Sequence, residues 1–411
     1  MTQQSAGDAS NARTLLTINC GSSSIKFAAY AVPRSGKAVE PQERYIGSVE
    51  RIGASDGRFE VKDAEGKSLA SDTLNVRDHT EAVHHALGWV EERLEGQKPA
   101  CVGHRIVHGG ARFEQPQRIS PDMLANLRTL IPLAPLHLPV EIAAIEAVDK
   151  RYPGLPQVAC FDTAFHRTMP REAQLFGIPR YFADEGIVRY GFHGLSYEYI
   201  VGELERASAG AGLAGRRIVV AHLGNGASMA AIRDGRSVDT TMGLTPIGGL
   251  VMSTRSGDMD PGALIYLLEA KHATADDIRK AVEKEGGLQG ISQTSSDMQD
   301  LLKRSELDER AAEAVAVFCH SARRLLGGLV SVLGGIDTLV FTGGIGEHAA
   351  EVRSRICDGQ AYMGIKIDAT RNAAHAPVIS DEGSAVTVRV MHTNEEMMIA
   401  RHSLSVLDNG C

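Results

Sequence analysis

Two arginines beside glycine-rich segments are the side chains best suited to chemistry in this 411-residue chain. Arg105 ends an apolar stretch just before Gly109-Gly110, and Arg255 lies in a loop expected to enter a helix at Pro261. Guanidinium groups can clamp a small carboxylate and neutralise charge on a phosphoryl group during its transfer. A single arginine is usually part of a solvated surface pair, but two beside glycine-rich loops favour anion chemistry.

An aspartate and a histidine could complete such a site. Asp162 ends another apolar stretch and could orient a nucleophile, hold an arginine or cap the next segment. His193 follows Gly191-Phe192 and could hydrogen-bond a transferring phosphate or satisfy a turn. Both interpretations stay open from the residues alone. The histidines near these motifs are expected to make structural hydrogen bonds: His104, His108, His166 and His222.

Three apolar strands run into turns of glycine and small polar residues: Thr14–Phe27, Arg217–Ile232 and Thr338–His348. Such turns offer backbone N–H groups to an anion, and Lys26 on the first returning strand adds positive charge. A Walker A loop would need GxxxxGK[ST] before a helix, so here the phosphate would lie on a β-hairpin. An ordinary hairpin is the alternative for any single turn. Together the three predict a duplicated α/β core that closes on a polyphosphate from two sides.

The third junction also permits a dinucleotide-binding interpretation. Gly344–Ala349 matches GxGxx[GA], and Asp368 follows at roughly the 20-residue spacing of that fingerprint. The fingerprint usually opens its domain, however, and it would leave the two earlier hairpins unexplained. A nicotinamide-dependent oxidoreductase is therefore the lesser alternative.

The composition is that of a large globular enzyme, with 43% hydrophobic and 23% charged residues. The length favours two or three domains. A net charge of −8 without a long basic run argues against a nucleic-acid or membrane partner. The first twelve residues contain no apolar signal-sequence core, and Leu325–Phe341 is interrupted as expected for a helix end before a strand. Six scattered cysteines fit a reducing cytoplasm without structural zinc.

Strand and helix patterns alternate along the chain, which favours a mixed or parallel sheet with helices on its faces. Strands are expected within 100–110 and 156–166. Helices are expected at 121–130, 140–148, 196–207 and 313–333.

In combination the motifs resemble those of the acetate kinase family of short-chain carboxylate kinases, within the superfamily of sugar kinases, heat-shock cognate proteins and actin. The likeness runs from Asn19–Ser24 to Thr393–Glu396, and its inner motifs are 103–110, 161–166, 190–194, 222–226, 254–258 and 344–347. It implies an α/β fold of duplicated actin-like (ribonuclease H-like) domains with an active-site cleft between them. It also implies an N-terminal domain of 1–166 completed by 397–411, and a nucleotide-binding domain of 167–396.

The resemblance further implies reversible, Mg²⁺-dependent, direct in-line transfer of the ATP γ-phosphoryl group to acetate, giving acetyl phosphate and ADP. Propionate or another short carboxylate is the alternative acceptor, Mn²⁺ is the alternative metal, and a non-catalytic actin-like nucleotide switch is a distant alternative. A cytoplasmic homodimer without nucleic-acid or membrane partners is implied. A carboxylate is already ionised at pH 7, so such a reaction needs positioning more than deprotonation.

The resemblance assigns roles by motif. Asn19 and Glu395 correspond to the metal site, and Arg105 to the carboxylate-binding arginine. Asp162 corresponds to the active-site acid/base or orienter, while His193 and Arg255 correspond to the transition-state stabilisers. The implied pocket for the methyl group consists of Val107, Leu136, Phe192 and Pro246. The implied nucleotide contacts are Lys26, His222, Leu223, Gly224, Asn225, Gly226, Asp297, Met298, Gln299, Gly344, Ile345, Gly346, Glu347 and His348.

Several positions depart from the family pattern, without removing a residue of the implied phosphoryl-transfer centre. Cys20 replaces an alanine, Ser253 a glycine, and the 245–250 loop lacks a glutamate. Leu138 and Glu141 replace asparagines. Together with Ser253, these changes leave the identity of the acyl substrate and the subunit interface undetermined. Gln299 replaces an arginine and His348 an asparagine, which leaves nucleotide preference open.

Overall fold

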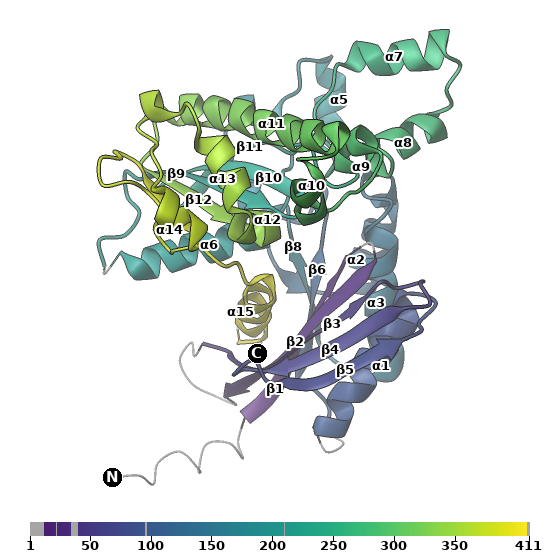
Figure 1. Cartoon of the computed structure of the whole chain (residues 1–411). Helices are drawn as coiled ribbons and strands as arrows, with labels where there is room; N and C mark the ends of the chain where they lie inside the picture. Colours follow the sequence, from purple (N-terminus) through teal and green to yellow (C-terminus); the bar gives the residue numbers. More distant parts are fainter. Residues whose placement is uncertain (1–11, 22, 34–39, 95–96, 209, 409–411) are drawn as a thin grey trace, which may run out of the picture. The chain divides into compact units, whose positions relative to one another are not determined.

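The computed structural model describes residues 12–21, 23–33, 40–94, 97–208 and 210–408 (Figure 1). The chain divides into two compact units, Met1–Ala164 with Asn394–Cys411 (unit 1) and Phe165–Thr393 (unit 2). Most of the first twelve residues, considered above for a signal sequence, lie outside the described part of the chain.

Unit 1 is built on an eight-stranded sheet in the order β5-β4-β3-β2-β1-β6-β8-β7. Its strands are β1 (Ala12–Cys20), β2 (Ser24–Pro33), β3 (Gln42–Glu50), β4 (Gly57–Asp63), β5 (Ser68–Leu74), β6 (Cys101–Ile106), β7 (Gln117–Arg118) and β8 (Gln157–Phe161). β1 and β2 form the predicted first hairpin, with Lys26 opposite Asn19 on the returning strand. β6 runs parallel to both β1 and β8, so the carboxyl ends of these three strands share one edge.

Helices cover both faces of this sheet. They are α1 (His79–Arg93), α2 (Pro121–Thr129), the short 3₁₀ helix η2 (Ile131–Leu133), α3 (Leu138–Arg151) and α15 (Glu395–Asp408). Because side chains alternate along a strand, Leu16 and Ile18 join the core beneath α1 and α3, whereas Leu15 packs with Ala400 and Leu404 of α15. The yellow C-terminal helix in Figure 1 thus completes the N-terminal unit.

Unit 2 repeats the central plan of unit 1. Its five-stranded sheet has the order β11-β10-β9-β12-β13, with β9 (Arg217–Leu223), β10 (Ala227–Arg233), β11 (Arg236–Thr240), β12 (Thr338–Thr342) and β13 (Thr387–Val390). Three antiparallel strands are followed by two parallel ones, as in β3-β2-β1-β6-β8. This repeated topology is the duplicated α/β core predicted from the sequence, and it is consistent with a duplicated actin-like fold.

The helices of unit 2 again lie on both faces of the sheet. α6 packs through Tyr197, Ile200 and Leu204 on the face that carries Ile218 and Val220 of β9, and α11 contacts β9, β10 and β11. The helical segments are η3 (Ala164–Thr168), α4 (Arg171–Gln174), α5 (Arg180–Asp184), α6 (Gly194–Ala207), α7 (Pro261–Ala270), α8 (Ala275–Glu283), α9 (Gly287–Ser292), α10 (Met298–Arg304), α11 (Glu309–Leu333), α12 (Gly343–His348), α13 (Ala350–Cys357), η4 (Ala361–Met363) and α14 (Ala369–Ala373).

α11 is long and apolar enough to cross a membrane by length and composition alone, a property shared by core helices. Phe318, Ala322 and Leu326 lie on its buried face. The helix ends at Gly334, whose φ of 69° is left-handed as in many C-terminal caps, and β12 follows. The predicted helix end followed by a strand is confirmed.

Two strand predictions were too long. The segment expected at 100–110 is extended only to Ile106, and the one at 156–166 only to Phe161. Beyond Phe161 the chain makes one more bond to the neighbouring strand, from the amide of Asp162 to the carbonyl of Ile106 at 3.0 Å, and then turns into η3. The strands therefore end earlier than predicted, and Val107, His108 and Asp162 lie just past their ends.

Candidate functional site

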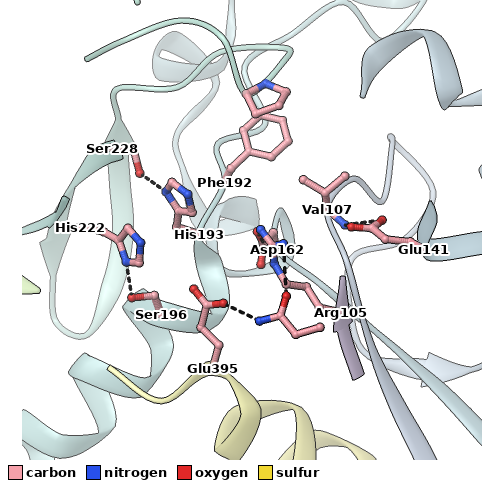
Figure 2. A network of polar contacts seen from close by, with 12 residues as sticks. Arg105, Val107, Glu141, Asp162, Phe192, His193, Ser196, His222, Ser228 and Glu395 are labelled. Atoms are coloured by element: carbon pink, nitrogen blue, oxygen red, sulfur yellow. Dashed lines mark hydrogen bonds and ion pairs between the residues drawn. The ribbon is translucent and has the colours of Figure 1, made fainter. Parts of the chain in front are cut away.

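In unit 1 the site is built around Arg105, near the carboxyl end of β6 (Figure 2). Asp162 directly follows β8, and the parallel pairing of Ile106 with Phe161 brings the two strand ends level. Nε and Nη2 of Arg105 both donate to Oδ2 of Asp162, at 3.0 and 2.5 Å. The aspartate is fully buried and the arginine side chain is 11% exposed. The two residues were proposed separately from sequence, and the structure joins them in a charge-assisted pair.

This pair keeps Arg105 charged in a buried setting. Burial works against the guanidinium charge, but the negative charges of Asp162 and Glu395 outweigh it and raise the pKa of Arg105. Nη1 also donates to Oδ1 of Asn19 at 3.4 Å. Arg105 is therefore held by both neighbouring strand ends, in one orientation.

Asn19 connects Arg105 to the start of α15. Its Nδ2 donates to Oε2 of Glu395 at 3.0 Å and to Oε1 of Glu396 at 3.1 Å. Lys26, opposite Asn19 in the hairpin, is exposed, and the charge of Glu396 raises its pKa. Glu396 was not a sequence candidate, although it directly follows the predicted Glu395.

Val107 is held through its backbone rather than its side chain. Its amide donates to both carboxyl oxygens of Glu141, at 3.3 and 3.1 Å, from the first turn of α3. Burial raises the pKa of Glu141 to about 8, against the opposing attraction of Arg105. Leu136 lies half-buried in the turn before α3. Sequence reasoning noted Glu141 only as a departure from a pattern and missed this contact.

In unit 2 the candidate site is built around His193, which directly precedes α6 (Figure 2). Its φ of 59° is left-handed, which is uncommon for a residue other than glycine. Nδ1 of His193 and Oγ of Ser228 are hydrogen-bonded at 2.8 Å, and Oγ of Ser228 also bonds the hydroxyl of Tyr197. Neither Ser228 nor Tyr197 was a sequence candidate, although Tyr197 lies one helical turn after His193.

His222 lies beside His193. The two rings stack with centroids 4.3 Å apart and planes 20° from parallel. Nδ1 of His222 bonds Oγ of Ser196 at 2.8 Å, and Thr393 donates to the same hydroxyl at 2.9 Å. Each imidazole is thus fixed by a serine at Nδ1.

Gly226 lies beside both His193 and the side chain of Arg255. A Cβ on Gly226 would lie 3.1 Å from Nε2 of His193 and 3.5 Å from Nη2 of Arg255. Nη1 of Arg255 donates to the carbonyl of Pro246 at 2.7 Å. The structure therefore brings together His193, Arg255 and the predicted 222–226 loop.

Phe192 and His166 are coupled through the backbone. Nε2 of His166 bonds the carbonyl of Phe192 at 3.0 Å, and its Nδ1 bonds Oγ of Ser237 at 2.8 Å. Burial lowers the pKa of His166 to about 4, so this ring is neutral near pH 7. Of the implied methyl-pocket residues, Phe192 and Pro246 belong to unit 2, and Val107 and Leu136 to unit 1.

The glycine loop after β12 lies next to the 222–226 loop. Thr342 pairs with His222, and Gly343 packs so closely on Leu223 that a Cβ would lie 2.8 Å from its carbonyl oxygen. Gly343 also has a φ of 77°, so glycine suits this position on both grounds. The predicted contacts of this loop, Gly344 to His348, form α12.

A buried arginine that the sequence did not single out supports α12. Arg353 is fully buried and donates to the carbonyls of Gly346 and Glu347 at 2.8 and 2.9 Å. Glu347 in turn accepts from the amide of Gly343 at 3.0 Å and bonds His392 at 2.9 Å. The remaining nucleotide candidates lie on α10, where Asp297 caps the helix, Met298 is buried and Gln299 is exposed.

Comparison with known proteins identifies the family. The acetokinase family model matches residues 14–401. The acetate kinase of Methylocella silvestris is 46% identical over 96% of this chain and 98% of its own. The chain belongs to the acetokinase family. Its fold is similar to crystal structures of Porphyromonas gingivalis acetate kinase (TM-score 0.82, 36% identity, 96% and 100% coverage) and Francisella tularensis propionate kinase (0.86, 34%, 96% and 100%).

Within this acetokinase the candidate residues form two groups, each described on its own unit. The group on unit 1 holds Arg105, Asp162, Asn19 and Glu395, and the group on unit 2 holds His193, His222 and Arg255 with two glycine loops. Over the described part of the chain, no three His, Cys, Asp or Glu residues are grouped so as to hold a metal ion. Asn19 and Glu395 nevertheless offer amide and carboxylate oxygens, the hard donors that Mg²⁺ prefers.

Proposed function

We propose that this chain is an acetate kinase, which transfers the γ-phosphoryl group of ATP reversibly to acetate and forms acetyl phosphate and ADP. The observation that carries the proposal is Arg105, a largely buried arginine fixed by Asp162 and followed two residues later by the buried Val107. A guanidinium beside an apolar side chain suits a carboxylate with a short apolar tail.

Arg105 and Asp162 act in this proposal by positioning. The substrate carboxylate is ionised at pH 7, so it needs orientation against another anion rather than removal of a proton. Asp162 holds the guanidinium through Nε and Nη2, which leaves the Nη1 side to face a ligand beside Asn19. Asp162 is an orienter of Arg105 rather than a general base.

In this proposal His193 and Arg255 stabilise the transferring phosphoryl group. His222, whose ring stacks on His193, contacts the nucleotide. Charge spreads over the equatorial oxygens during transfer, and preorganised donors there supply most of the catalysis. The loops 222–226 and 343–348 would hold the nucleotide phosphates with Lys26, and Asp297, Met298 and Gln299 would contact the base. We propose that both groups of residues serve this one direct, in-line transfer.

Asn19 and Glu395 would hold Mg²⁺, or Mn²⁺ in its place. When bound, the ion neutralises charge on the nucleotide phosphates. Mg²⁺ is usually bound by one or two carboxylates with phosphate oxygens and water, which fits a set of one amide and one carboxylate. The hydrogen bond between Asn19 and Glu395 brings these donors to one point of unit 1.

Acetate is the proposed acceptor, with Val107, Leu136, Phe192 and Pro246 around its methyl group. Propionate is the second candidate because the similar Francisella tularensis structure is a propionate kinase. A hydrophobic pocket separates substrates that differ by one methylene by only about 10–200-fold. Both substrates are therefore expected to react, with acetate preferred.

We also propose a cytoplasmic homodimer in which the two units are the two actin-like domains. The described cysteines Cys20, Cys101, Cys160, Cys319 and Cys357 are free and buried, as is common in a reducing compartment. α7 exposes Ile265, Tyr266 and Leu268, and Met259 lies exposed just before it. Such a clustered apolar surface favours contact with a second copy.

The test offers the protein ATP, Mg²⁺ and one- to four-carbon carboxylates with hydroxylamine, and measures acyl hydroxamate. Acetyl hydroxamate should form, and ADP with acetyl phosphate should give ATP in the reverse direction. Failure in both directions would overturn the proposal. Protection against thermal unfolding by ATP but not NAD would set aside the oxidoreductase alternative, and acyl phosphate formation would set aside the nucleotide switch.

A further inference from the structure

A second carboxyl group stands beside the proposed carboxylate site. Glu141 is 1% exposed in the first turn of α3, and both its oxygens accept from the amide of Val107. It interacts electrostatically with Arg105 and Asp162. Charged glutamates are almost never fully buried unless a cation pairs with them directly. Here the direct contact is a neutral amide, and Asp162 occupies Nε and Nη2 of the nearby guanidinium.

The charge balance of this cluster leaves little room for another anion. Arg105 is the cation among Arg105, Asp162, Glu141 and Glu395, and a substrate carboxylate would add a fourth acidic group around it. In a buried site, neighbouring carboxylates cannot all remain ionised, and one of them takes up a proton. Asp162 accepts two guanidinium bonds that favour its ionised form. Glu395 is only half-buried, so water stabilises its charge. Glu141 is 1% exposed and lacks bonds to Arg105 among the hydrogen bonds of the described residues, so it is the group that takes the proton.

We propose that Glu141 is a positioning residue for carboxylate binding: it takes up one proton when the substrate carboxylate binds Arg105, and in its neutral form it keeps the Val107 backbone in place. The inference rests on the proposed function, because it needs a carboxylate substrate at Arg105. It makes the affinity for that substrate depend on pH.

The surroundings of Glu141 support this assignment. Burial already raises its pKa to about 8, so an added negative charge nearby would act on a group poised to bind a proton. The titratable groups that face it are Arg105 from β6, Asp162 after β8 and Cys20 at the end of β1. The helices α1 and α2 form salt bridges with later residues of α3. These salt bridges are Glu91–Arg151 from α1 and Arg128–Glu146 from α2. His108 directly follows Val107, and its Nδ1 accepts a hydrogen bond from the amide of Gly110.

The first test measures KM for acetate between pH 6 and 9.5 with saturating Mg²⁺ and ATP. Acetate itself stays ionised over this range, since carboxylic acids titrate near pH 4 to 5. With a pKa of about 8, KM should rise about tenfold from pH 7 to pH 9, while KM for ATP does not follow. Glu141→Gln, which imitates the protonated form, should hold KM for acetate nearly constant at its low-pH value.

Glu146→Gln is the matched control. Glu146 lies on the same helix but is half-exposed and paired with Arg128. It should keep the wild-type profile, because it has no contact with Val107 among the described hydrogen bonds. The proposal is overturned if Glu141→Gln and wild type share one pH profile, or if wild-type KM does not change with pH.

The second test uses the wild-type protein, so it does not depend on the folding of a variant. Acetate binding is measured by calorimetry at pH 8 in two buffers that differ in ionisation enthalpy. About half a proton should be taken up per site, because about half of the unliganded Glu141 groups are already protonated near their pKa. Zero uptake or proton release would refute the inference. Loss of all acyl hydroxamate formation would instead refute the proposed function, so the two failures are distinguishable.

Discussion

Replacing Ser228 by alanine tests whether the bonds behind His193 matter for phosphoryl transfer. Ser228 is fully buried on β10, and its hydroxyl bonds both Nδ1 of His193 at 2.8 Å and the hydroxyl of Tyr197. The substitution removes one partner from each of these groups. Weakening buried polar groups in this way costs about 1–3 kcal/mol, so the free energy of unfolding should fall by roughly that amount.

The larger effect is expected on turnover. Without the Ser228 hydroxyl, the imidazole of His193 can turn about its side-chain bonds, and Nε2 loses its fixed place beside Gly226 and Arg255. A displacement of about 1 Å in such a group can cost about 10²-fold in rate. We therefore expect kcat to fall about 10- to 100-fold, with KM for ATP and acetate changed by less than about threefold, because the bond serves transfer more than ground-state binding.

Tyr197→Phe is the matched control. It removes the second hydroxyl but keeps the bond between Ser228 and His193, so it should lower stability with a loss of kcat below about tenfold. Hydroxamate kinetics and urea denaturation of both variants give the comparison. A Ser228→Ala protein that is destabilised yet turns over at the wild-type rate would refute the role of this bond, as would equal losses of kcat in the two variants.

Three further predictions concern the remaining groups. Arg255→Ala should lower kcat about 10²–10³-fold with little change in ATP affinity. Arg105→Ala should raise KM for acetate and also lower kcat. If either variant has near wild-type kinetics, that arginine does not belong to the site. Val107→Ala should raise kcat/KM for propionate relative to acetate, and an unchanged ratio would exclude Val107 from the pocket. Because burial raises the pKa of Glu141 from 4.5 to about 8, folding stability contributed by its protonated form is lost as pH rises through that interval. Glu141→Gln should therefore raise Tm more at pH 9 than at pH 5, and an equal shift at both would contradict the raised pKa.

The hairpins and the outer helices could be predicted from sequence because their signals are local. Glycine-rich turns between apolar strands indicated β1–β2 and β9–β10, and Asp234-Gly235, with φ values of 55° and 74°, forms the expected reverse turn. The apolar spacing of α11 predicted its buried face. The similarity of the two hairpins predicted a duplicated core, and the structure adds the repeated strand order of the two sheets.

The supporting residues could not be predicted, because their partners are distant in sequence. Ser228 meets His193 across 35 residues, and Arg353 meets Asn372 across 19, at positions where serine and arginine have many ordinary roles. Glu141 lies 34 residues from Val107. Its burial depends on how α3 packs on β1 and β6, which no local pattern encodes. The motifs indicated candidate site residues, but they did not indicate the residues that hold these candidates in place.

The two arginines differ in a way that suits two different tasks. Nε and Nη2 of Arg105 both donate to the carboxylate of Asp162, so the charge of Arg105 is already balanced within unit 1 and its value is directional. Nη1 of Arg255 donates to the carbonyl of Pro246, which holds the side chain beside Gly226 and Nε2 of His193. A ground-state carboxylate needs a fixed guanidinium fork, whereas charge that develops during transfer needs preorganised donors at the phosphoryl group. This contrast favours Arg105 for binding and Arg255 for catalysis, and Glu141, which adds a titratable group beside Arg105, then acts on substrate affinity rather than on the transfer step.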